Sequence, residues 1–535
     1  MTPAESPPTP EISAIDSLGR GTIIMVFGTF ALLLLNLIGR VYTARHLSVA
    51  QFGDFNLGLS FAGLLSLIAL VGLHQAMART IAETRDPGVR RRIIAFAASV
   101  TAVTSVAASA LVYFFAASIA SIFNPAGSAQ LTQVFQLFSV TIGLTLLCTF
   151  LASIFQGFED TLPNAWLNQA VQPGAFVVFV FVFFYFHLAL EGALIAWVLS
   201  NAVTFGALVV YTIRRLPKHL PPAEPSVKRE LPQGLLGLSF ALWGVTTLTF
   251  VTAYIDTLIL GVFRPEAQVG VYSAVMTLAR LILVVSAAVT YIFLPVAARL
   301  WGQRDRRTLR EMFVTTTRWI MIFTVPILLL FALLPTDSIV TVFGSAYASG
   351  AQALVLITVG ALISVVFGPV NAALAGMGAT RPLLVSTAIS AVTNVALSFA
   401  LIPTYGLMGA AMAWTVARVL YPATAALALY FSYGIQPFYR TLLLPLGLSL
   451  GIGVPLFLLI PLVPHPAWLV FPLYFAGLAL CIGMVLATRS IEPGDFVVCR
   501  IAERAVGRPL PRLRRLMERA LSTTDWDRVE AAHSG

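Results

Sequence analysis

The chain has 535 residues, of which 58% are hydrophobic and 10% are charged, and its mean hydropathy is +0.88. Soluble globular proteins carry about 25% charged residues, so the composition excludes that class and indicates a membrane protein. We expect the net charge of +10 to attract anionic membrane lipids and not nucleic acid. The cysteines (Cys148, Cys481 and Cys499) match neither a disulfide framework nor a metal site, and no cofactor motif is present.

Residues 1–19 are polar and Pro-rich, and they predict a short N-terminal tail in place of a signal peptide. Many of the apolar stretches that follow reach the ~20 residues that cross a bilayer as a helix. We predict an all-α integral membrane protein with about fourteen transmembrane helices. The predicted spans are 20–43, 56–79, 93–119, 134–156, 167–187, 191–212, 237–262, 271–297, 317–334, 351–375, 382–402, 406–431, 440–461 and 467–488.

The spans group into two six-helix lobes and two extra C-terminal helices. The N-lobe covers residues 20–212, and the C-lobe covers 237–432. A polar, Pro-rich linker at 213–236 joins them. Spans 13 and 14 occupy 433–488 and would brace the bundle, extend a groove for a lipid tail or mediate assembly. Residues 489–535 predict a basic amphipathic helix on the cytoplasmic leaflet, with the docking of a partner enzyme as the alternative.

Basic residues predict the orientation of the spans. Of the 33 Lys and Arg residues, 28 fall on one side of the predicted membrane. The other side has three, Arg40, Arg45 and Arg264, and two more, Arg280 and Arg418, fall inside spans. The positive-inside rule therefore predicts that both termini are cytoplasmic.

The two predicted lobes repeat each other in the same order. The matching pairs are Ala50–Phe55 with Ala267–Tyr272, Gly157–Pro163 with Gly376–Pro382, and Gly192–Trp197 with Gly409–Trp414, at offsets of 217, 219 and 217 residues. Each repeat holds six spans, so both lobes enter the membrane in the same direction. A repeated membrane unit is typical of transporters whose substrate site lies between the halves.

Charges inside spans are the candidates for function, because each is costly in the bilayer. Arg40 follows Asn36 by one turn in span 1, Arg280 lies in span 8 and Arg418 in span 12. Asp256 is the acidic residue well inside a span. The arginines predict a cationic cavity for a phosphate or diphosphate, which bidentate guanidinium groups recognise.

A structural role competes with this interpretation. At 1.5 Å per residue, Asp256 lies roughly 9 Å and Arg280 roughly 13 Å from the outer ends of adjacent antiparallel spans. An ion pair between them would pin two helices together. For Asn36 and Asn371, hydrogen bonding between helices competes with substrate binding. Asn371 follows Gly368-Pro369, so it is a candidate to line a kinked or unwound stretch and contact a sugar.

The loops next to spans 1, 4 and 8 resemble those of a known family. The chain is similar to the polysaccharide transport family over about residues 18–435. The residues that carry this resemblance are Arg45-His46-Leu47 with Gln51–Phe55, Val269–Tyr272, Gly157…Thr161…Pro163 and Asp256. This family includes the O-antigen flippases, and its wider superfamily also holds lipid II flippases and multidrug and toxin extrusion transporters.

The resemblance implies a V-shaped pair of six-helix bundles that work by alternating access. It also implies that a polyprenyl-diphosphate-linked oligosaccharide moves from the cytoplasmic to the outer leaflet, and that polysaccharide-assembly enzymes are possible partners. Relatives line a central cavity with arginines of the first spans and of span 8. By position Arg40 and Arg280 correspond to these arginines, and Arg418 corresponds less closely.

Three other functions compete with an oligosaccharide flippase. A cation-coupled drug or metabolite exporter predicts carboxylates at membrane depth in the N-lobe, where the sequence has none. A lipid II flippase agrees with fourteen spans, but the loops around Gly53 and Gly270 favour the polysaccharide family. A membrane-embedded glycosyltransferase or polymerase requires an extramembrane loop rich in carboxylates, and the longest outer loop, about 335–350, carries only Asp337.

Overall fold

A computed structural model describes residues 33–84, 86–125, 129–160, 162–220 and 234–436, with a few isolated positions from 447 to 479. All regular elements within these residues are helices, as predicted. Apart from the isolated positions, spans 13 and 14 lie outside the described residues, as do the predicted N-terminal tail and the amphipathic C-terminal helix.

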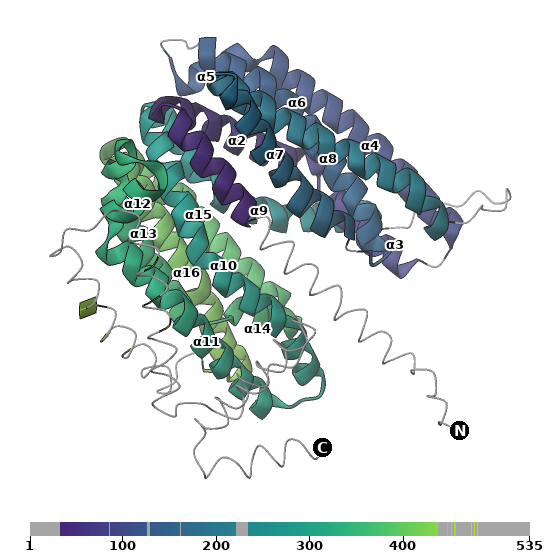
Figure 1. The fold of residues 1–535 in the computed structure, drawn as a ribbon. Helices are drawn as coiled ribbons and strands as arrows, with labels where there is room; N and C mark the ends of the chain where they lie inside the picture. Colours follow the sequence, from purple (N-terminus) through teal and green to yellow (C-terminus); the bar gives the residue numbers. More distant parts are fainter. Residues whose placement is uncertain are drawn as a thin grey trace, which may run out of the picture. The chain divides into compact units, whose positions relative to one another are not determined.

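The chain forms two compact units, residues 1–270 and 271–535. Besides helical residues 33–46, the first unit contains α2 (Val49–Leu70), α3 (Leu73–Glu83), α4 (Pro87–Phe114), α5 (Ala116–Phe123), α6 (Ala129–Gly157), the π-helix η1 (Pro163–Val171), α7 (Gln172–Tyr185), α8 (Leu190–His219) and α9 (Leu235–Phe263). Figure 1 shows α4, α6, α7 and α8 as a layer of long helices.

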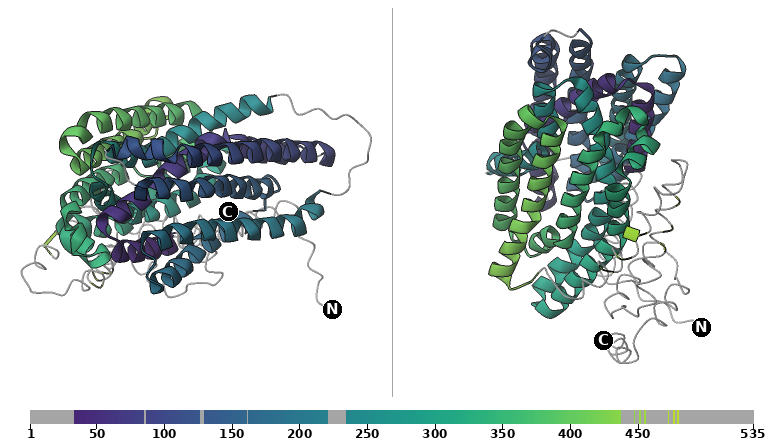
Figure 2. Two further views of the ribbon diagram at one scale, coloured as in Figure 1. Left: turned by 90° about the horizontal axis from the view of Figure 1, so that it is seen from above. Right: turned by 90° about the vertical axis from the view of Figure 1, so that its left-hand side faces the viewer.

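The second unit begins within α10 (Glu266–Gly302). It continues with α11 (Arg306–Leu333), α12 (Pro335–Phe343), the 3₁₀ helix η2 (Ser345–Gly350), α13 (Ala351–Val366), α14 (Val370–Gly376), α15 (Thr380–Tyr405) and α16 (Leu407–Tyr433). Its long helices also lie side by side when the molecule is turned (Figure 2). Residues 335–350, predicted as an outer loop, are therefore largely helical.

Nine helical segments in the described part of the chain are long and apolar enough to cross a membrane. A tenth is α9, if its two halves, which meet at a bend of 47°, count as one span. Fourteen spans remain a prediction, because the last two predicted spans lie outside the described residues.

Helix α2 begins earlier than predicted, within the loop assigned to follow span 1. Ser48 is its N-cap, and the Gln51 N–H donates to Ser48 Oγ over 3.2 Å. The Ser48 N–H donates in return to Gln51 Oε1 over 3.1 Å, which completes a capping box. The predicted span 2 therefore starts at Val49 and places the first copy of the repeat motif on a helix.

The predicted span 2 is also broken, between α2 and α3. Val71 and Gly72 have φ angles of 47° and 65°, which end the helical hydrogen bonding. Helix α9 supplies donors for the freed carbonyls, because Ser239 Oγ donates to Val71 O over 2.5 Å and Trp243 Nε1 donates to Ile68 O over 3.2 Å. A broken helix is tolerated in a membrane only where such partners exist.

Two glycines of the repeat meet where α2 and α10 begin. A Cβ atom on Gly53 would collide with the carbonyl oxygen of Glu266, and one on Gly270 would collide with the carbonyl oxygen of Val49. The positions 53 and 270, and 49 and 266, are each 217 residues apart, which is the offset of this repeat motif. The contact is therefore two-fold symmetric, and it explains why both copies of the motif carry glycine.

The core of the second unit joins four helices. Phe293 and Ala297 of α10 pack with Phe313 of α11, Leu374 of α14 and Leu429 of α16. This cluster holds the short helix α14 in place, directly after a break in the chain that forms part of the candidate site.

Asp305 is the N-cap of α11, and the Thr308 N–H donates to its Oδ1 over 3.0 Å. Hydrogen bonds from Thr308 lower the pKa of the Asp305 carboxyl, because they stabilise its charged form. This cap defines where α11 begins.

Candidate functional site

The site in the second unit is built on a broken helix. Predicted span 10 ends as α13 at Val366 and resumes as α14 at Val370. Gly368 has a φ of 64°, and a Cβ atom there would collide with the side chain of Thr317 on α11. Pro369 has no N–H to continue the helix. The break therefore follows from Gly368-Pro369, the pair that the sequence singled out.

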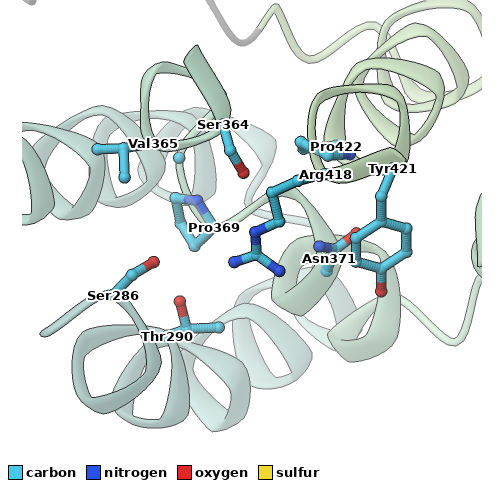
Figure 3. A pocket seen from close by; sticks show the side chains of 10 residues that line it. Ser286, Thr290, Ser364, Val365, Pro369, Asn371, Arg418, Tyr421 and Pro422 are labelled. Carbon is cyan, nitrogen blue, oxygen red and sulfur yellow. The ribbon is translucent and has the colours of Figure 1, made fainter. Parts of the chain in front are cut away.

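A cavity of about 200 Å³ lies beside this break. It is lined by Ser286, Thr290, Ser364, Val365, Gly368, Pro369, Asn371, Arg418, Tyr421 and Pro422. Figure 3 shows the Arg418 guanidinium directed into the space between Pro369 and Thr290, with Asn371 beside it. Two predicted site residues, from helices α14 and α16, thus share one cavity.

Arg418 and Asn371 both present buried polar atoms to this cavity. Within the described residues, neither Arg418 Nε nor Asn371 Oδ1 has a hydrogen-bond partner. Leaving a buried polar atom without a partner costs about 1–3 kcal/mol, and more for a charged group. A cavity of this volume has room for water or a small ligand to satisfy both atoms.

The other polar groups around the cavity are hydroxyls. Ser286 and Thr290 are four residues apart on α10 and so lie on one helical face. Ser364 is near the end of α13, and Tyr421 is one turn after Arg418 on α16. A guanidinium surrounded by hydroxyl donors can bind an anion.

The repeat shows that this charge belongs to one unit only. Arg418 is four residues after Trp414, and its counterpart in the first unit is Asn201, four residues after Trp197. The Asn201 amide donates to the carbonyl oxygen of Trp197 over 2.8 Å, within its own helix. The first unit therefore holds a locally satisfied amide where the second places a cation in a cavity.

Arg40 lies in the first unit, on helical residues 33–46, one turn after Asn36. Its Nη1 donates to Asn56 Oδ1 on α2 over 2.9 Å. Asn56 is 2% exposed, and its own amide donates to the carbonyl oxygen of Phe52 over 2.7 Å. Asn56 therefore positions the Arg40 guanidinium, a role that the sequence prediction missed.

Arg280 is exposed in α10, although the preceding residues Leu278 and Ala279 are each 1% exposed. An arginine at membrane depth that no protein covers has to face water or lipid headgroups, because hydrocarbon does not solvate its charge. Asp256 differs, since it is 1% exposed and its Oδ1 accepts from the Thr257 N–H over 2.8 Å.

The structure brings Arg418 together with Asn371, and Arg40 together with Asn56 on the neighbouring helix. Arg40 and Asp256 belong to the first unit, and Arg280 and Arg418 belong to the second. The Asp256–Arg280 ion pair and the convergence of the three arginines stay predictions. Sequence reasoning also missed the cavity hydroxyls, because single Ser and Thr residues are common in membrane helices.

Comparison with known proteins shows which families and structures this chain resembles. The profile of the family described as "Polysaccharide biosynthesis protein" matches residues 18–301, and that of MatE matches residues 244–400. A comparison with curated proteins gives no match.

Solved structures with the same fold include a lipid II flippase MurJ in an inward closed conformation, at a TM-score of 0.67 and 14% identity over 87% of this chain and 99% of that one. An inward-facing multidrug resistance MATE family transporter of the MOP superfamily matches at a TM-score of 0.61 and 16% identity, over 78% and 98% of the two chains. A MOP superfamily transporter from Pyrococcus furiosus matches at a TM-score of 0.54 and 17% identity, over 78% and 95%.

The fold of this multi-pass membrane protein is thus similar to that of a lipid II flippase and of MOP superfamily transporters. Since the matching profile covers more than half of the sequence, the chain belongs to the polysaccharide biosynthesis protein family.

Proposed function

We propose that this protein is a flippase that moves a lipid-diphosphate-linked oligosaccharide from the cytoplasmic to the outer leaflet of the plasma membrane. Both termini are cytoplasmic in this proposal, because 28 of the 33 Lys and Arg residues lie on that side of the predicted spans. Family membership supports the polysaccharide pathway, and the likeness to MurJ and MATE structures supports alternating access.

The observation that carries the proposal is the sign of the accessible charge. Arg280 is exposed midway along α10, and the Arg418 guanidinium points into a cavity. The Asp256 carboxylate is buried and accepts a backbone N–H. Cationic groups on an exposed helix face and beside a cavity favour a substrate with phosphate charges over a cationic drug.

The proposed cycle uses these groups in a fixed order. Arginines bind the diphosphate from the cytoplasmic side, polar side chains and water surround the glycan, and the polyprenyl tail stays in the bilayer. The two units then rock so that the charged group faces the outer leaflet. The arginines hold the diphosphate through charge and hydrogen bonds, without a covalent step. The diphosphate can therefore bind on the cytoplasmic side and be released on the outer side.

A cation-coupled exporter is the second candidate, and Asp256 is the observation that favours it. A carboxylate inside a span is a proton or sodium site in many transporters. In that case Asp256→Asn abolishes transport, and neutralising Arg280 has little effect.

The test is a set of variants in proteoliposomes, with the folded fraction measured for each. We expect Arg280→Ala to abolish movement of the lipid-linked oligosaccharide and Arg280→Lys to retain part of it. The double variant Asp256→Asn/Arg280→Gln separates site from structure. If it folds and transports normally, the proposal for Arg280 is wrong; if each single neutralisation lowers folded protein and the double restores it, the two residues form a structural ion pair.

A further inference from the structure

We propose that the cavity around Arg418, lined by described residues of the second unit, is an anion site that binds one phosphate-sized oxyanion. The anion is either free inorganic phosphate or a phosphoryl group of the transported lipid, and only the second source rests on the proposed function. In both cases Arg418 is the binding cation.

The cavity size fits such a ligand. Sites for drug-sized molecules usually enclose about 300–1,000 Å³, whereas one water needs only about 10–15 Å³. The cavity of about 200 Å³ therefore accepts a phosphoryl group with a few waters, but excludes an oligosaccharide. The glycan and the lipid tail remain outside it.

The donors fit the chemistry of an oxyanion. Arg418 offers a buried Nε–H without a partner, and guanidinium groups bind phosphate through two parallel hydrogen bonds. Ser286, Thr290 and Ser364 add hydroxyls on the surrounding walls. The Asn371 side chain offers its Oδ1 as an acceptor for a protonated or hydrated oxyanion. Rotation of the amide by 180° presents its NH2 group instead, with two donors.

Charge balance points the same way. A guanidinium inside a membrane protein needs a counter-charge or solvation, and the described residues lining the cavity include no carboxylate. Packing alone does not require an arginine at this position of the repeat, because Asn201 fills the equivalent position in the first unit. The Asn201 amide is satisfied by a hydrogen bond within its own helix. An anion bound at Arg418 supplies the missing charge.

The test is phosphate binding to the purified full-length protein, and it requires no transport. We expect inorganic phosphate, added to a chloride-free gluconate buffer, to raise the melting temperature in a saturable way. Arg418→Gln should abolish this rise, because a charge-assisted hydrogen bond is typically worth a factor of about ten or more in Kd. Arg299→Gln, which neutralises an exposed arginine of α10 outside the cavity and outside the proposed transport site, should keep it.

Two further measurements keep the test decisive. Arg418→Gln should melt at or above the wild-type temperature without phosphate, since it removes a buried unpaired charge. If it fails to fold, Ser286→Ala/Thr290→Val should weaken phosphate binding several-fold in a folded protein. No saturable rise in the wild type, or an equal rise in Arg418→Gln, overturns the proposal.

Competition then identifies the source of the anion. If the site takes a phosphoryl group of the transported lipid, inorganic phosphate should raise the apparent KM for that lipid in proteoliposomes. If the site takes free phosphate, the KM should not change although phosphate still binds. Binding of phosphate in a protein that moves no lipid-linked oligosaccharide would support the anion site and contradict the proposed function, so the two can fail separately.

Discussion

The close approach of α2 to the first residues of α10, all within the first unit, makes a sharp prediction for Gly53 and Gly270. An alanine at either position would place its Cβ against the carbonyl oxygen of the opposite helix, and 3.1 Å or 3.2 Å from the opposite glycine nitrogen. These carbonyls belong to backbone and cannot rotate away, so the helices have to separate. Overpacking of this kind costs about 1–3 kcal/mol. The better helix propensity of alanine returns at most about 1 kcal/mol.

Each single substitution should therefore lower the free energy of unfolding by about 1–2 kcal/mol. The symmetry of the contact determines the double variant. Separation of the two helices, once forced by one methyl group, also makes room for the other. We expect Gly53→Ala/Gly270→Ala to cost little more than one substitution, with a coupling energy of about 1 kcal/mol or more.

The assay is reversible unfolding of the purified protein in detergent and a mild denaturant, followed for wild type, both single variants and the double variant. Gly206→Ala is the matched control, because a Cβ at Gly206 on α8 meets nothing within 4 Å. It should be neutral or slightly stabilising. Additive costs for the two alanines, or no cost for either, would refute the close symmetric contact of Gly53 and Gly270.

Three further predictions concern the site and its supports. Gly368→Ala should destabilise the second unit by about 2 kcal/mol more than Gly378→Ala, as measured by thermal unfolding. Both glycines have a positive φ, but only a Cβ at Gly368 collides with a side chain. Asn56→Leu should raise the KM for the lipid substrate several-fold with near-normal folding, since it removes the hydrogen bond that positions Arg40; an unchanged KM would exclude that role. Asp305→Ala should remove an acid-dependent part of the stability. Hydrogen bonds lower the pKa of the Asp305 carboxyl in the folded state, so its contribution is present above its ordinary pKa and is lost as the pH falls through the lower folded value; equal pH profiles for wild type and Asp305→Ala would contradict this.

Local signals predicted much of the fold. Apolar length predicted the helices, and the repeat predicted the related positions that now prove to be in contact at Gly53 and Gly270. The Gly368-Pro369 pair predicted a break, because its chemistry acts on its own backbone. The capping box at Ser48 was equally readable, yet the predicted spans 20–43 and 56–79 left these residues in a loop.

Tertiary features could not be predicted from local signals. The break at Val71-Gly72 depends on donors from α9, which is about 170 residues away in the chain. Arg418 and Asn371 line the same cavity because α16 packs against α14. Whether Arg418 Nε has a hydrogen-bond partner depends on the shape of that cavity. The sequence identified the arginine as costly, but not what surrounds it.

Movement of a lipid-diphosphate-linked oligosaccharide by the wild-type protein tests the central claim most directly. The protein is reconstituted with the labelled lipid in liposomes, and the fraction reached by a membrane-impermeant glycosidase is followed over time, with protein-free vesicles as the baseline. A flippase makes the protected half of the label accessible, and Arg40→Ala/Arg280→Ala with normal folding stops this. Label that stays protected while a cation gradient drives efflux of cationic dyes would contradict the account and identify an exporter.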